Sequence, residues 1–273
     1  MYWGAYSGWL IGLFRGSEDP YRAQLDFLST YGLNVASLSA RSLLAMDAGR
    51  REEIAGWLEE LDIYSILGIG FDYFAEDPDE IKRGTDSVLE TLETLPKMMR
   101  TLICSTGDKK HHRWTRNPSL PEQLDHLSRV LAPVAEAAHQ AGTPVGWHNS
   151  VRYPSDIAEL CRRTPHLGIL YDTGNPFHVG ERPLDAAQAV APYTVGLHVK
   201  DHYVAPVWKP ILALQLTSAV PGSGDVMIKE VYDIIVQNVP DPDRLVVEIE
   251  IDPIEGMRPE KAVEKAVAFV RTL

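Results

Sequence analysis

Four segments of the chain end in side chains of the kinds that bind metal ions, and each end follows an apolar run. His148 closes PVGWH, Asp172 closes GILYD, His198 closes TVGLH, and two glutamates, Glu248 and Glu250, lie within RLVVEIEID. A mixture of imidazoles and carboxylates suits Mn, Zn, Co or Fe better than Mg or Ca, which favour shells made of oxygen. The four segments therefore predict a divalent metal site, provided that the fold brings their ends together.

Each of these residues also has an ordinary structural explanation. Asp172 stands in LYDTGN, where Asp, Gly and Asn are typical of a turn that ends a strand. A single His at a strand end is commonly a hydrogen-bonded core residue, and glutamates two apart occur on many exposed strands. Four such ends on successive strands favour the metal site, because charged groups in an apolar interior must be paired or must coordinate a cation.

The segments that would position these residues alternate between apolar strands and amphipathic helices along the whole chain. Asp19 and Pro20 are a cap and first-turn signal for the first helix, and Gly32 is a stop signal for it. The expected strand and helix pairs occupy residues 2–9 and 19–32, 33–40 and 47–62, 62–75 and a helix from 77, 100–107 and 121–142, 143–150 and 154–165, 166–175 and 183–192, 193–201 and 228–239, and 244–252 and 258–273.

Eight strand and helix pairs predict an α/β fold, a (β/α)8 TIM barrel that forms a single domain over residues 1–273. Such barrels take roughly 250 residues, and their strands are buried on both faces. An open doubly wound sheet is the alternative. The barrel is preferred because no strand runs directly into a glycine-rich phosphate loop and because the count closes at eight. Chemistry in a barrel lies where strands end and the following loops begin.

Composition limits the possible partners. The formal net charge is -12, which argues against nucleic acid and anionic membranes as partners and favours a small neutral or cationic substrate or a metal ion.

The apolar start of the chain is too short to span a bilayer and is expected to be the first strand. The only two cysteines, Cys104 and Cys161, lie in apolar or helical patterns, which predicts a reducing, cytoplasmic location. A homo-oligomer is compatible with the sequence, which does not fix an oligomeric state.

Four motifs of the second half occur in a fixed order: DTGN at 172–175, HVKD at 198–201, GSGD at 222–225, and a last strand that ends in glutamate. In these motifs and in its layout the chain resembles the xylose-isomerase-like TIM barrels, the sugar isomerase and epimerase superfamily that includes apurinic endonucleases. The resemblance covers nearly the whole chain. It implies a divalent metal held by glutamate, aspartate, histidine and glutamate on strands five to eight.

By motif, Asp172 and His198 match this ligand set, and Glu248 matches the last position better than Glu250 because it follows RLVV at the usual offset. The fifth strand departs from the family, which commonly reads Glu-Asn-His where this chain reads His148-Asn149-Ser150. The resemblance thus implies the metal ligands His148, Asp172, His198 and Glu248.

The resemblance also implies an enzyme: a metal-dependent isomerase or epimerase that acts on a keto or aldo sugar, or a sugar-like polyol, through an enediolate. Mn is the preferred metal, with Zn, Co, Fe or Mg as alternatives. Glu248 and His148 are the expected proton-transfer groups, and Lys200 either stabilises an enolate or forms a salt bridge. The expected substrate contacts are His178, Asn175, Glu250 and Trp147.

Three other functions are alternatives, and His148 motivates the first and the last of them. A histidine removes one negative charge from the site and leaves the metal more electrophilic, which favours a lyase, dehydratase or decarboxylase that uses the same site. An apurinic endonuclease is less favoured, because its later Asp-x-His ligand pair is not apparent in GSGDVMIKE and the chain is acidic. A non-catalytic partner subunit is the third alternative.

Overall fold

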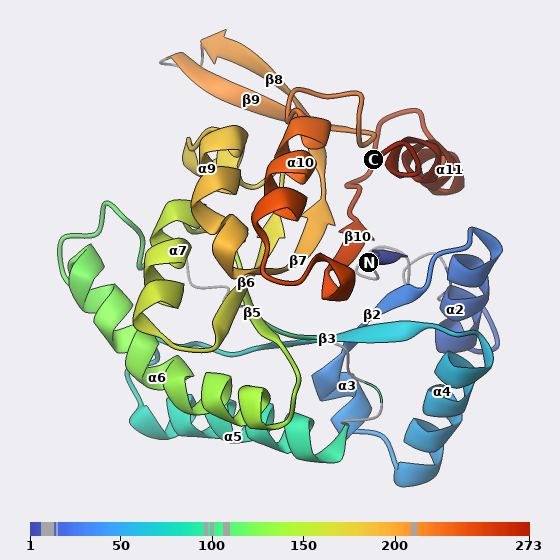
Figure 1. The fold of residues 1–273 in the computed structure, drawn as a ribbon, viewed down its shortest axis with the longest axis horizontal. Helices are drawn as coiled ribbons and strands as arrows, with labels where there is room; N and C mark the ends of the chain where they lie inside the picture. Colours follow the sequence, from blue (N-terminus) through green and yellow to red (C-terminus); the bar gives the residue numbers. More distant parts are fainter. Residues whose placement is uncertain (7–13, 15, 96–97, 99–100, 106–109, 209–211) are drawn as a thin grey trace.

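In the computed structural model, the parallel strands form a closed barrel that is surrounded by helices (Figure 1). The structure describes residues 1–6, 14, 16–95, 98, 101–105, 110–208 and 212–273. Around the barrel the strands follow the order β1-β10-β7-β6-β5-β4-β3-β2, and every neighbouring pair is parallel. The predicted (β/α)8 barrel is confirmed.

The barrel strands coincide with the apolar runs of the sequence. Their bounds are β1 Tyr2–Ala5, β2 Val35–Ser39, β3 Tyr64–Gly70, β4 Thr101–Ser105, β5 Val145–His148, β6 Leu167–Asp172, β7 Thr194–Val199 and β10 Val246–Ile249. The first strand was expected over residues 2–9, of which residues 7–9 lie outside the described part of the chain.

The first helix begins at its predicted cap, and a later helix begins at a cap that was not predicted. The Asp19 carboxylate accepts the backbone N–H groups of Tyr21 and Arg22, and Ser119 forms a capping box with Glu122. The helices are α2 Pro20–Thr30, α3 Ala40–Leu44, α4 Ala48–Glu60, α5 Pro78–Thr94, α6 Leu120–Gln140, α7 Pro154–Arg163, α8 Pro176–Val179, α9 Pro183–Val190, α10 Ile228–Asn238 and α11 Pro259–Val270. Among the described residues, no helix has the length and hydrophobicity that crossing a bilayer requires.

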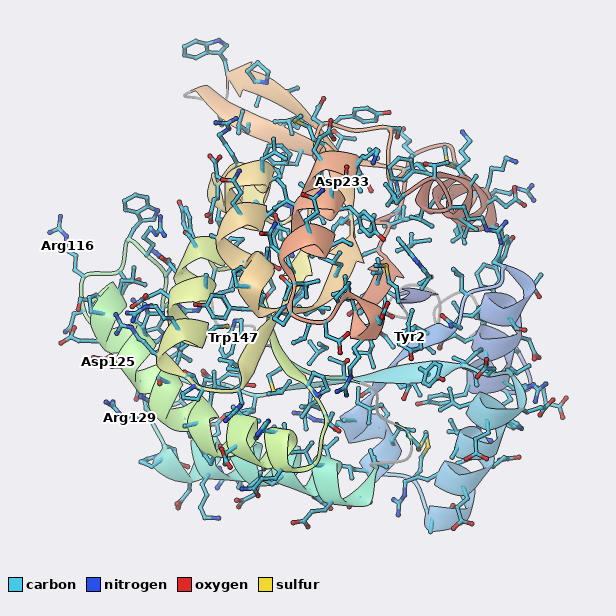
Figure 2. The ribbon with its side chains drawn as sticks, viewed as in Figure 1. Tyr2, Arg116, Asp125, Arg129, Trp147 and Asp233 are labelled. Carbon is cyan, nitrogen blue, oxygen red and sulfur yellow. The ribbon has the colours of Figure 1, made fainter. Side chains whose placement is uncertain are left out.

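Two apolar clusters hold the barrel together. The smaller one fills the barrel interior and consists of Val35, Ile66, Ile103, Leu170 and Val246, one residue from each of five strands. The larger cluster lies between the strands and the helices. Charged side chains such as Asp125 and Arg129 of α6 point away from the barrel, whereas Trp147 lies within the molecule (Figure 2). The interior cluster forms the floor beneath the polar side chains at the strand ends.

A two-stranded antiparallel hairpin extends from the barrel between β7 and α10 (Figure 1). Its strands are β8 Asp201–Trp208 and β9 Leu212–Ala219, and the Trp208 side chain is 77% exposed. The sequence patterns did not predict this hairpin. Pro206 lies within β8, and a proline lowers the strand signal of a run.

Candidate metal centre

Four potential ligands converge at the carboxyl ends of the strands. His148, Asp172, His198 and Glu250 each offer one ligand atom, and these atoms all lie within 4.8 Å of one another. The first three belong to the adjacent strands β5, β6 and β7, and Glu250 directly follows β10. Because parallel strands present their carboxyl ends at one rim, residues far apart in sequence meet here.

Three of the four ligands present buried atoms that have no hydrogen-bond partner among the described residues. These atoms are His148 Nε2, Asp172 Oδ2 and His198 Nδ1. His148 Nε2 lies 3.9 Å from Asp172 Oδ2. Since nearly all buried polar atoms in proteins are hydrogen-bonded, three atoms without a hydrogen bond in one cluster are an exception that a coordinated cation would resolve. The residues present therefore fit a divalent metal ion.

Burial and mutual charge set the protonation of two ligands. Burial and the neighbouring charge of His198 lower the pKa of His148 to about 3, so its imidazole is neutral and can donate a lone pair. Burial and the charge of Glu250 raise the pKa of Asp172 to about 7. A divalent cation would favour the ionised carboxylate of Asp172, because its attraction for the negative charge would outweigh the repulsion from Glu250.

His198 lies between two carboxylates. Burial alone would lower its pKa, but Glu248 and Glu250 outweigh this effect and raise the pKa to about 10. His198 Nε2 is 3.1 Å from Glu248 Oε2, and His198 Nδ1 is 2.6 Å from Glu250 Oε2 without hydrogen-bond geometry. Burial would raise the pKa of Glu250, but His198 and Lys200 lower it well below its usual range.

The fourth ligand position differs from the sequence-based expectation. Glu250, which was expected to bind substrate, lies in the cluster, and Glu248, which was expected to bind metal, does not. Glu248 pairs in register with His198, so on the same strand face Glu250 lies two residues closer to the rim. The Glu248 side chain is fully buried beside Ser37. Both glutamates face the barrel interior, but they lie at different heights along the barrel axis.

The turn after β6 fixes Asp172. Its Oδ1 accepts the backbone N–H groups of Gly174 and Asn175, at 2.9 and 3.1 Å. Its own N–H donates to Asn149 Oδ1 at 2.7 Å, and Asn149 Nδ2 donates to its carbonyl at 3.1 Å. Asp172 is thus both a turn residue, through Oδ1, and a potential ligand, through Oδ2. Sequence patterns had not identified Asn149 as the support.

Lys200 forms the salt bridge that was one of its two expected roles. Its Nζ is 2.8 Å from Glu250 Oε1 and 3.1 Å from Asp252 Oδ2, and its side chain is 9% exposed. Burial would lower the pKa of Lys200, but the carboxylates of Asp172 and Glu250 outweigh it and raise the pKa. Lys200 remains charged and holds one oxygen of Glu250 in place.

A cavity of about 480 Å³ opens beside the ligands. His148, Leu170, His198 and Glu250 form one side of it, and the rest is formed by Tyr6 after β1, by residues of β2, β3 and β4, and by Tyr21 of α2 and Ser42 of α3. That second side carries the hydroxyl-bearing residues Tyr6, Tyr21, Ser37, Ser39 and Ser42. Among the described residues that line the cavity there is no lysine or arginine. The cavity therefore suits a neutral, hydroxyl-rich molecule better than an anionic one.

Three of the predicted substrate contacts do not line this cavity. Trp147 is 1% exposed and packs on Tyr73 with ring centroids 4.8 Å apart, because successive strand residues alternate and His148 takes the interior face. Asn175 is buried in the turn of Asp172. His178 is exposed, and its ring lies 5.1 Å from that of His202.

With this geometry established, comparison with known proteins identifies the family. The model of the xylose isomerase-like TIM barrel family matches residues 25–273. The chain belongs to this family. No curated protein matches the sequence at a significant level.

Several solved structures share the fold at low sequence identity. A 3-keto-D-glucoside 4-epimerase from E. coli has a TM-score of 0.74 at 13% identity and covers 100% of both chains. A D-psicose 3-epimerase from Clostridium cellulolyticum has a TM-score of 0.73 at 14% identity, over 100% of this chain and 98% of that one. A probable 3-DHS dehydratase from Bacillus anthracis has a TM-score of 0.70 at 14% identity, over 99% of both chains.

Proposed function

We propose that this protein is a divalent-metal-dependent isomerase or epimerase of keto or aldo sugars. The proposed ligands are His148, Asp172, His198 and Glu250, with Mn as the preferred metal. The observation that carries the proposal is the set of three buried ligand atoms that accept or donate no hydrogen bond among the described residues, next to a cavity lined by hydroxyl groups. Two structural neighbours are sugar epimerases by name, which agrees with this class of substrate.

The metal, when bound, supplies a Lewis acid that polarises a substrate carbonyl and acidifies the adjacent C–H bond. Glu250 is the proposed base for that proton. It lines the cavity, and Lys200 keeps it ionised and oriented. As it removes the proton, the C–H electron pair forms the carbon–carbon double bond of an enediolate, and the carbonyl oxygen takes the charge. Return of the proton to the neighbouring carbon, with transfer of the hydroxyl proton from that carbon's oxygen to the former carbonyl oxygen, completes an isomerisation.

An epimerisation requires a second base on the opposite face of the carbon. His148 lines the same cavity, but a neutral imidazole that gives its one lone pair to the metal has none left for a proton, so an epimerisation would need a second base other than His148. The sequence analysis expected Glu248 to transfer the proton. We assign this role to Glu250, because Glu248 is buried and is not among the described residues lining the cavity.

Elimination of water from a keto sugar is the second candidate function. It starts with the same proton abstraction, but a hydroxyl group then leaves from the next carbon. The observation that favours it is His148, which replaces a carboxylate and so leaves the ligand set less negative. A structural neighbour named as a probable dehydratase agrees with this alternative.

Solvent exchange tests the proposal and separates the two reactions. The protein, loaded with Mn²⁺, is incubated in D₂O with a panel of ketoses, aldoses and 3-keto-glucosides. Isomerisation or epimerisation places deuterium on a carbon next to the carbonyl, whereas elimination gives an unsaturated ketone with new ultraviolet absorbance. Asp172→Asn serves as the control. Absence of bound metal together with absence of deuterium and of unsaturated product in every sugar would refute the proposal.

A further inference from the structure

The Glu248 carboxylate is fully buried and lies on the side of His198 away from Glu250. Among the described residues it has two partners. Ser37 Oγ is 2.6 Å from each of its oxygens, and His198 Nε2 is 3.1 Å from Oε2. A buried carboxylate is costly unless it is paired and hydrogen-bonded, so a residue in this place requires a reason.

The contact between Ser37 and Glu248 spans one intervening strand of the barrel. Ser37 belongs to β2 and Glu248 to β10, and β1 runs between them. At this level β1 carries Gly4, which pairs in register with both Glu248 and Val35. A Cβ atom at Gly4 would lie 2.3 Å from the carbonyl oxygen of Val35. The position therefore stays without a side chain, which lets β1 and β2 lie close together next to the contact between Ser37 and Glu248.

The two nitrogens of His198 have different surroundings. Nε2 faces Glu248, whereas Nδ1 faces the cluster, where Glu250 Oε2 lies 2.6 Å away without hydrogen-bond geometry. If Nε2 carries the proton and donates it to Glu248, Nδ1 presents its lone pair to the cluster. A histidine that binds metal through one ring nitrogen commonly donates the other N–H to a carboxylate, which fixes the tautomer and raises the basicity of the ligand.

We propose that Glu248, held by Ser37, is the positioning residue of His198: it fixes the tautomer that turns Nδ1 toward the metal. This inference rests on the proposed metal site. Glu248 thereby tunes the site through the imidazole, without contact to substrate.

Metal titration of the full-length protein tests this role. Mn²⁺ affinity is measured calorimetrically for the wild type and for Glu248→Gln, Ser37→Ala, Glu250→Gln and Ser65→Ala. Ser65 is the matched control for Ser37, since it is also a buried barrel-strand serine and its Oγ has no hydrogen-bond partner among the described residues. We expect Glu248→Gln to weaken Mn²⁺ binding roughly 10- to 100-fold, Ser37→Ala to weaken it several-fold and Glu250→Gln to weaken it most. Ser65→Ala should bind like the wild type.

A spectroscopic measurement separates positioning from direct ligation. In the Co²⁺-loaded protein, Glu248→Gln should shift the visible bands while their intensity, which reports coordination number, stays close to that of the wild type. Unchanged affinity in Glu248→Gln would overturn the inference, and so would complete loss in Glu248→Gln with retention in Glu250→Gln. If Glu248→Gln does not fold, Ser37→Ala decides, and affinity equal to that of Ser65→Ala overturns the inference. A wild type that binds none of Mn²⁺, Co²⁺, Zn²⁺ or Mg²⁺ would instead refute the proposed function.

Discussion

His148 Nε2 and Asp172 Oδ2 lie 3.9 Å apart on adjacent strands, and neither atom has a hydrogen-bond partner among the described residues. A neutral imidazole and a carboxylate in this arrangement provide one nitrogen and one oxygen to a shared cation. The first two predictions concern this pair.

Asp172→Asn should remove the carboxylate charge and leave the turn in place, because the amide oxygen can still accept the N–H groups of Gly174 and Asn175. Mn²⁺ affinity should fall by more than about 100-fold, since loss of a ligand costs more than loss of an outer-shell partner. Calorimetric titration measures the effect. Asp185→Asn, at a surface position of α9, is the control and should bind like the wild type. Wild-type affinity in Asp172→Asn would exclude this residue as a ligand.

His148→Glu restores the carboxylate that the family commonly carries on the fifth strand. The added negative charge should tighten Mn²⁺ binding about tenfold, because a unit charge at contact distance in a partly buried site is worth several kcal/mol before desolvation. It should also favour isomerisation or epimerisation over elimination. Product analysis by NMR in D₂O gives the ratio. An unchanged ratio would mean that the fifth-strand residue does not select the reaction.

Lys200→Met removes the cation that holds Glu250 through a 2.8 Å contact. We expect kcat to fall roughly 10- to 100-fold with a small change in KM, because the proposed base loses orientation while the cavity keeps its shape. Lys229 pairs with Asp233 on the surface, so Lys229→Met is the matched control and should leave kcat unchanged. Equal activity of the two variants would remove Lys200 from the mechanism.

Asp19→Ala should lower the free energy of unfolding by about 1 kcal/mol at neutral pH, the usual cost of a lost N-cap. Partial burial would raise the pKa of Asp19, but the N–H of Arg22 and the guanidinium of Arg50 lower it below the usual 3.8 of an aspartate. A lowered pKa means that the contribution is present above this value and is lost as the pH falls through the folded-state pKa. Urea unfolding at pH 7 and pH 3 should show the difference shrinking at pH 3. Asp19→Asn, which retains a cap, should cost less than the alanine variant at pH 7.

Gly4→Ala should lower the free energy of unfolding by about 2 kcal/mol or more, because its Cβ would lie 2.3 Å from the carbonyl oxygen of Val35 and backbone would have to move. Gly56→Ala is the contrasting variant. It lies inside α4 with no atom within 4 Å of its added Cβ, so it should raise stability by about 0.5–1 kcal/mol. Denaturant unfolding of both variants provides the test, and a neutral Gly4→Ala would show that β1 and β2 can separate.

The strand ends that carry the ligands were predictable from sequence, but their heights were not. Apolar runs followed by polar ends located His148, Asp172 and His198. The two glutamates of β10 share a face because strand side chains alternate, so periodicity treats Glu248 and Glu250 alike. Which of them reaches the rim depends on the stagger between β10 and β7, in which Glu248 pairs with His198. That stagger is a property of the closed barrel.

Two other differences have separate causes. The inward position of His148 could have placed Trp147 on the opposite face, since neighbouring residues of a strand alternate. The β8–β9 hairpin gave a weaker signal, because Pro206 lies within one strand and the sequence between the two strands contains no Asn-Gly or Asp-Gly pair. Its pairing register is established by contacts between its two strands.

The side of the cavity opposite the ligands comes from a different half of the barrel. The ligands follow β5, β6, β7 and β10, whereas Ser39, Ser42 and Gly70 belong to β2, α3 and β3. Under the proposed function, Ser39 and Ser42 can therefore be exchanged without altering the ligand cluster. For a laboratory that wishes to change which sugar such a site accepts, these two positions are the ones to mutate, while Ser37, which holds Glu248, is kept with the ligands.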